Sequence, residues 1–111
     1  RCCYSPGKPY SVEETLLNIK NAGGKAFVAH PHLIRNKKRL QALLELDFDG
    51  IECFYSKISA SQEKPFIQLA HRKGLLVSGG SDFHGVITPH IQLGCSWTDK
   101  KNVEGIFEKK I

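Results

Sequence analysis

An aspartate and a histidine stand two residues apart in the stretch SDFHG at positions 81–85. Carboxylate oxygen and imidazole nitrogen are ligands for divalent zinc, manganese and iron. Residues i and i+2 of an extended segment point to the same side, so Asp82 and His84 can face one pocket. Gly79 and Gly80 precede them and allow the chain to fold sharply. The spacing alone also suits a polar turn with an exposed histidine, so it leaves a metal site and a turn open.

Further polar side chains lie in or beside two other short apolar runs. KAFVAHPH at positions 25–32 ends with His30, and Pro31 prevents the run from continuing as a helix. His32 lies two residues beyond, and Pro31 leaves its direction open. Glu52 stands inside the run GIECF. A buried carboxylate needs a hydrogen-bond partner or a metal, and both roles are compatible with its position.

Short apolar runs alternate with amphipathic segments along the chain, which predicts parallel strands covered by helices. Polar caps and glycine stops mark the helix ends. The predicted helices begin at Ser11, at Asn36, at Ser59 or Ser61, and at Lys101, and the last continues to Lys110; the predicted strands span 25–30, 50–54, 75–78 and 92–96. In the last helix, Val103, Ile106 and Phe107 are expected to face inward.

In parallel α/β folds the ligand site gathers at the carboxyl ends of the strands. His30 closes the first predicted strand, and Asp82 and His84 follow the third. These three residues therefore fall where a site belongs. His71 near a helix end and His90 in a loop are weaker candidates.

The composition suits one ordinary globular domain of 111 residues. The longest apolar runs are too short to cross a bilayer, so we expect no membrane association. The net charge of +5 is compatible with a phosphate-bearing partner, although the cations are scattered and also suit a solvated surface. There is no P-loop, dinucleotide-binding or nucleophile-elbow motif.

The four cysteines form no C-x-x-C pair, which argues against a zinc knuckle. Cys53 and Cys95 lie inside apolar runs and are predicted to be small buried side chains. This usage predicts a reducing, cytoplasmic setting.

Three phrases together resemble the PHP (polymerase and histidinol phosphatase) superfamily: GGKAFVAHP at 23–31, GIECFYS at 50–56 and GLLVSGGSDFHG at 74–85. The similarity is greatest to the stand-alone phosphoesterases that act on nucleotides and short oligonucleotides. It runs from about Lys8 to Gly94. The last phrase is the most specific of the three.

The resemblance implies a distorted TIM-like (β/α)7 barrel that holds two or three divalent metal ions, of Mn, Zn, Fe or Mg. By motif position, His30, Asp82 and His84 match metal ligands of the family. The implied chemistry is phosphoester hydrolysis by a metal-activated water, acting on a phosphorylated small molecule, a nucleotide or a short oligonucleotide. Arg35 and Lys57, with His32, are candidate substrate contacts by position, and no residue is assigned as a catalytic acid or base.

The early motifs of the family, beginning with an H-x-H pair, do not occur in residues 1–25. Residues 1–111 are therefore expected to form a single domain that is the C-terminal half of such a barrel. Two alternatives stay open. The chain can be a non-catalytic half-barrel or degenerate relative, or it can belong to another class of divalent-metal hydrolase, such as the amidohydrolases.

Overall fold

The computed structural model describes residues 9–108 as helices alternating with short strands. In chain order the elements are α1 (Val12–Asn21), β1 (Phe27–Val28), the 3₁₀ turn η1 (Pro31–Leu33), α2 (Lys37–Leu44), β2 (Gly50–Tyr55), α3 (Ala60–Lys73), β3 (Leu76–Gly80), the 3₁₀ turn η2 (Gly85–Ile87) and α4 (Lys100–Phe107).

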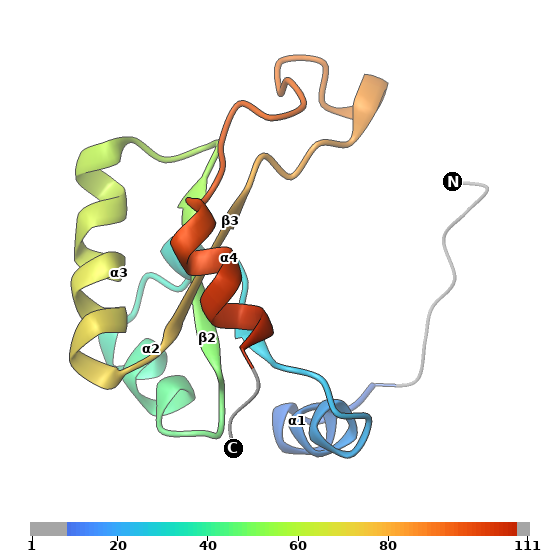
Figure 1. The fold of residues 1–111 in the computed structure, drawn as a ribbon, viewed down its shortest axis with the longest axis vertical. Coiled ribbons are helices and arrows are strands. Elements are labelled where there is room, and N and C mark those ends of the chain that lie inside the picture. The colour runs from blue at the N-terminus through green and yellow to red at the C-terminus, as the bar shows by residue number, and fades with distance from the viewer. Residues whose placement is uncertain (1–8, 109–111) are drawn as a thin grey trace.

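The strands form a three-stranded parallel sheet in the order β1-β2-β3. Figure 1 shows their carboxyl ends at one end of the sheet, where the chain continues from β3 into a projecting segment. The predicted α/β class and the parallel sheet are confirmed. Because parallel strands end at the same edge, the loops after β1, β2 and β3 are neighbours.

Side-chain caps begin the first three helices where the sequence predicts them. Ser11 accepts a hydrogen bond from the Glu14 amide, and Asn36 accepts from two amides of the first turn of α2. Ser59, rather than Ser61, caps α3 and forms a complete capping box with Gln62. These caps satisfy amides that the helix itself leaves without partners.

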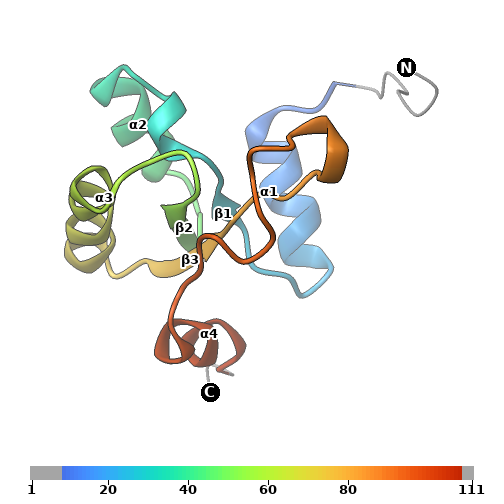
Figure 2. The ribbon, with the colours of Figure 1, turned by 90° about the horizontal axis from the view of Figure 1, so that it is seen from above.

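The helices surround the sheet on more than one side. Viewed from above, α2 and α3 lie together on one side, α1 lies on the opposite side, and α4 lies beside β3 (Figure 2). Ile51, Cys53 and Ala70 have no exposed surface. They form the centre of the core with four further buried residues, Val28, Leu40, Leu44 and Val77. The buried position predicted for Cys53 is confirmed.

Two glycines allow the strands to approach closely. A Cβ at Gly50 would lie 2.3 Å from the ring of Phe27, and one at Gly79 would lie 2.6 Å from Cβ of Phe54. Between Glu52 and Phe54 the pairing of β2 with β3 shifts by one residue, as in a β-bulge. A bulge re-aims the side chains that follow it, and the candidate site begins directly beyond this one.

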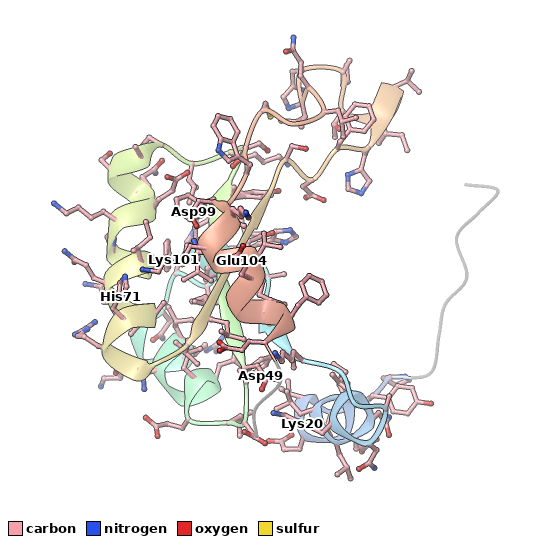
Figure 3. All side chains as sticks on the ribbon, viewed as in Figure 1. Lys20, Asp49, His71, Asp99, Lys101 and Glu104 are labelled. Atoms are coloured by element: carbon pink, nitrogen blue, oxygen red, sulfur yellow. The ribbon has the colours of Figure 1, made fainter. Side chains whose placement is uncertain are left out.

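At the amino end of the sheet, Asp49 joins α1 to the strands. Its Oδ1 accepts a hydrogen bond from Lys20 Nζ at 2.9 Å, and its Oδ2 accepts one from the Ala26 amide at 2.7 Å. Figure 3 shows Lys20 and Asp49 close together below the sheet. The hydrogen bond from Lys20 to Asp49 raises the pKa of Lys20 above its ordinary value of 10.5.

The fourth predicted strand, at 92–96, is wrong. This stretch consists of turns and bends, in which the Cys95 amide donates to the Gln92 carbonyl. It belongs to the projecting segment, where no described strand lies beside it to complete a ladder. Cys95 is accordingly exposed, so its predicted burial is also wrong.

The last predicted helix exists, but its ends and its inner face differ from the prediction. It spans Lys100–Phe107, and Lys110 lies outside the described residues. Val103 and Phe107 were expected to face inward, yet they are 40% and 79% exposed. The helix contacts mainly the edge strand β3, so a single strand covers too little of its surface to bury them.

Among the helices in residues 9–108, none combines the length and the apolar character needed to cross a lipid bilayer.

Candidate metal centre

His30 and Asp82 meet at the carboxyl end of the sheet. His30 lies two residues beyond β1, Asp82 lies two residues beyond β3, and His30 Nε2 is 3.4 Å from Asp82 Oδ2. They are also the two non-glycine residues of the described chain with positive φ, at 47° and 55°. Such backbone costs about 1–3 kcal/mol per residue and is concentrated at functional sites. The turns that create this strain bring the two side chains together.

Asp82 is held by the strand between these two segments. The hydroxyl of Tyr55, the last residue of β2, donates a hydrogen bond to Asp82 Oδ2 at 2.9 Å. Next to it, Ser56 Oγ donates to the carbonyl of Ser81 at 2.7 Å. The end of β2 thus fixes both the backbone that leads into Asp82 and the carboxylate itself.

His84 lies on the outer side of the same turn and is half exposed. Its Nδ1 lies 2.8 Å from the backbone carbonyl of Asp82 and 3.5 Å from Asp82 Oδ1. A carbonyl only accepts, so Nδ1 carries the proton in this hydrogen bond. The neutral ring then has its lone pair on Nε2, the arrangement common in metal-binding histidines.

Glu52 supports His30 through the backbone. Its Oε1 accepts a hydrogen bond from the His30 amide at 3.1 Å, and the same oxygen lies 3.9 Å from His30 Nε2. The backbone hydrogen bond that the sequence left as one alternative is therefore present. It holds His30 in its left-handed conformation.

His32 also packs against this group, although Pro31 left its direction open in the sequence. The rings of His30 and His32 lie 4.8 and 5.0 Å from the ring of Tyr55, centroid to centroid. His32 Nδ1 is buried and has no hydrogen-bond partner among the described residues. Burial, followed by the neighbouring His30, lowers the pKa of His32.

The two candidate cations follow different strands. Lys57 follows β2, and its charge helps to lower the pKa of both His32 and Asp82. Arg35 lies beyond η1 and lines a groove with His32. His71 is on the outer side of α3 (Figure 3), and His90 is exposed in the projecting segment. Neither of these last two histidines shares a hydrogen bond or ion pair with Asp82 within residues 9–108.

Asp82 and Tyr55 influence each other's ionisation. The hydrogen bond from Tyr55 lowers the pKa of the Asp82 carboxyl, and nearby His84 and His30 act in the same direction. Burial and the bond to Asp82 raise the pKa of Tyr55 to about 12. The pair therefore consists of an ionised carboxylate and a neutral phenol at neutral pH.

Tyr55 is the member of this group that sequence reasoning missed. Alternation along β2 buries Ile51, Cys53 and Tyr55 alike, so Tyr55 resembles a core residue. Its position at the end of a strand, in the phrase GIECFYS, is the signal that could have identified it.

Imidazole and carboxylate groups suit a divalent metal, and the hydrogen bond at His84 Nδ1 leaves its Nε2 free to bind one. The side chains as placed do not complete such a site. Within residues 9–108, no group of three or more His, Cys, Asp or Glu side chains is arranged to hold a metal ion. These imidazole and carboxylate groups therefore fit a divalent metal only as one part of a larger set of ligands.

No family model matches the chain. Among curated proteins, it is 37% identical over 92 residues to a 3′,5′-nucleoside bisphosphate phosphatase of Chromobacterium violaceum, covering 72% of this chain and 32% of that protein. It is 33% identical over 110 residues to the 5′-3′ exoribonuclease Rnm of Escherichia coli, covering 95% of this chain and 37% of that protein.

A phosphoribosyl 1,2-cyclic phosphate 1,2-diphosphodiesterase of Eggerthella lenta is 35% identical over 71 residues, which cover 62% of this chain and 27% of that protein. The fold is similar to the crystal structure of a candidate metal-dependent phosphoesterase from Bifidobacterium adolescentis. That match has a TM-score of 0.73 and 33% identity, and it covers 93% of this chain and 38% of that one.

The relatives are thus proteins named for phosphoester chemistry, and the chain spans between 27% and 38% of the length of each. These similarities confirm the resemblance inferred from the sequence: the chain matches one part of a PHP-superfamily protein.

Proposed function

We propose that the protein to which this chain belongs is a metal-dependent phosphoesterase that hydrolyses nucleotide or oligonucleotide phosphoesters. The observation that carries this proposal is the meeting of His30 and Asp82 at the carboxyl ends of β1 and β3, at 3.4 Å and on strained backbone. The names of the relatives, a bisphosphate phosphatase, a cyclic-phosphate diphosphodiesterase and an exoribonuclease, support the reaction class.

In this proposal His30, Asp82 and His84 are metal ligands. A divalent metal bound there supplies a polarised phosphate and a water of lowered pKa. The chain's own groups do the positioning. Tyr55 orients the Asp82 carboxylate by its hydrogen bond, and the Asp82 carbonyl fixes the tautomer of His84.

Two cations complete the proposed site by attracting the substrate. Lys57 lies close enough to influence Asp82, and Arg35 lines the same groove as His32. Positive charges beside a cleft raise the local concentration of an anionic substrate. We assign them, with His32, to substrate binding.

We further propose that the three parallel strands are part of a TIM-like (β/α)7 barrel, and that residues 1–111 form a single domain that is the C-terminal half of this barrel. The remaining strands would bring further ligands, so that two or three ions of Mn, Zn, Fe or Mg bind between them. A reducing, cytoplasmic setting suits the free thiols of Cys53 and Cys95.

The test is an assay of the full-length protein with Mn²⁺, using a nucleoside bisphosphate and a short oligoribonucleotide as substrates. Asp82→Ala should abolish hydrolysis of both, whereas His71→Ala, on the outer side of α3, should leave it unchanged. Full activity in Asp82→Ala would show that Asp82 is not a metal ligand of the active site.

A further inference from the structure

A groove of about 460 Å³ runs between α2 and α3, on the side of the sheet that these helices cover. One wall is apolar and consists of side chains that also contact the core. The groove residues are His32, Ile34, Arg35, Lys37, Leu40, Gln41, Pro65, Phe66, Leu69 and Arg72.

The charges along this groove have one sign. Arg35, Lys37 and Arg72 line it, and none of its lining residues is a carboxylate. All three cations are exposed, and none of them has an ion pair among those identified in residues 9–108. A row of unpaired cations beside an apolar wall suits a ligand that carries both phosphates and flat apolar groups.

His32 connects the groove to the candidate metal centre. Its ring packs on Tyr55, which holds Asp82, and the same residue lines the groove. Its Nδ1 is buried and lacks a hydrogen-bond partner among the described residues, so this side chain is not held by a polar contact of its own there. The groove therefore begins at a residue that packs beside the site, so a molecule long enough to pass His32 can reach both.

We propose that this groove binds the part of a single-stranded oligonucleotide that lies beyond the scissile phosphoester. Backbone phosphates contact Arg35, Lys37 and Arg72, and a base or sugar rests on Phe66 and Leu69. The proposal rests on the proposed function, because it takes the strand end at Asp82 as the place of hydrolysis. It adds a preference for substrates several nucleotides long.

The test measures binding, so that it does not depend on turnover. In the full-length protein, the double variant Lys37→Gln/Arg72→Gln removes two groove cations. The matched control Lys38→Gln/Lys64→Gln removes two exposed lysines from the same helices, outside the groove. Fluorescence anisotropy with a labelled five-nucleotide oligoribonucleotide reports affinity at several salt concentrations.

The groove variant should bind the oligonucleotide about tenfold more weakly than the control variant. The slope of log affinity against log salt should fall by about 1.4, or about 0.7 for each phosphate that the protein no longer neutralises. The weakening should be larger for the five-nucleotide probe than for a labelled mononucleotide. Equal affinities in the two double variants, or equal weakening for both probes, would overturn the proposal.

The two proposals fail separately. If hydrolysis depends on Asp82 but the groove variant binds like the control, the groove assignment is wrong and the enzyme assignment stands. If no phosphoester is hydrolysed and the groove variant still loses affinity for the longer probe, the groove binds oligonucleotide, but its placement beyond a scissile phosphoester is wrong together with the enzyme assignment.

Discussion

Asp49 and Asp82 are carboxylates at opposite ends of the same small sheet, and their surroundings differ. Asp49 receives hydrogen bonds from Lys20 and from the Ala26 amide, and it ties α1 to the strands. Asp82 receives a hydrogen bond from Tyr55, lies beside His30 and His84, and has left-handed backbone.

The partners of Asp49 are a cation and a backbone amide, which compensate the charge of a carboxylate that has a structural role. The partners of Asp82 are a phenol and two imidazoles, which orient a carboxylate without neutralising it when they are uncharged. The comparison teaches that burial and ion pairing alone do not identify a functional acid. The kind of partner and the backbone strain distinguish Asp82, at the candidate site, from Asp49, at the other end of the sheet.

Among the variants that test this comparison of Asp49 with Asp82, the largest effect on activity is expected at Tyr55. Tyr55→Phe removes the donor to Asp82 Oδ2 and keeps the ring that packs on His30 and His32. Loss of a group that orients a metal ligand should reduce kcat/KM of the full-length protein about 10–100-fold. Tyr10→Phe, at an exposed tyrosine before α1, is the matched control. Wild-type activity and Mn²⁺ affinity in Tyr55→Phe would show that this hydroxyl does not position the site.

At the other end, Asp49→Ala should affect stability instead of chemistry. It leaves the Ala26 amide and Lys20 without the acceptor they use, which should lower the free energy of unfolding by about 1–3 kcal/mol. The specific activity of the folded protein should not change. Urea denaturation followed by circular dichroism measures the free energy of unfolding, and assays at low temperature measure the specific activity. A loss of activity with unchanged stability would break the comparison.

Backbone strain predicts a smaller effect on stability, of opposite sign at Asp82 and at Asp49. At Asp82, where φ is 55°, the Gly variant should be more stable than the Ala variant by about 1 kcal/mol, because alanine is strained there. At Asp49, which is not among the positive-φ residues, the order should reverse by about 0.4–1 kcal/mol. Denaturation of the four variants gives both differences. The same order at both positions would remove strain as a distinguishing feature.

The smallest effect is the pH dependence of the Lys20–Asp49 pair. The pKa of Lys20 is raised in the folded protein, so the pair contributes its full stabilisation below the ordinary value of 10.5. This contribution is lost as the pH rises through the raised pKa. The difference in unfolding free energy between the wild type and Asp49→Ala should therefore shrink above about pH 10.5. A difference that stays constant to higher pH would contradict the assignment.

Much of this arrangement could be predicted from local sequence. Caps such as Ser59 and the alternation of apolar runs locate the helices and strands, because local hydrogen bonds and burial decide them. The strand-end rule then places His30 near Asp82 without knowledge of the turns. The prediction of a strand at 92–96 was wrong because apolar residues form a strand only beside another strand, and none of the described strands pairs with this stretch.

The role of Tyr55 was not predictable in the same way. Its burial makes it resemble Ile51, and its hydrogen bond depends on the left-handed turn at Asp82. Such a turn has no clear sequence signal when the residue is not glycine. The hydrogen bond from Tyr55 to Asp82 therefore had to come from the structure.

The most direct test of the central claim is anomalous diffraction from crystals of the full-length protein grown with Mn²⁺. The account predicts an anomalous peak within bonding distance, about 2.0–2.4 Å, of side-chain atoms of His30, Asp82 and His84. Asp82→Asn crystals should lose or weaken this peak, and Asp49→Asn crystals should keep it. Peaks elsewhere with none at these three residues would contradict the account.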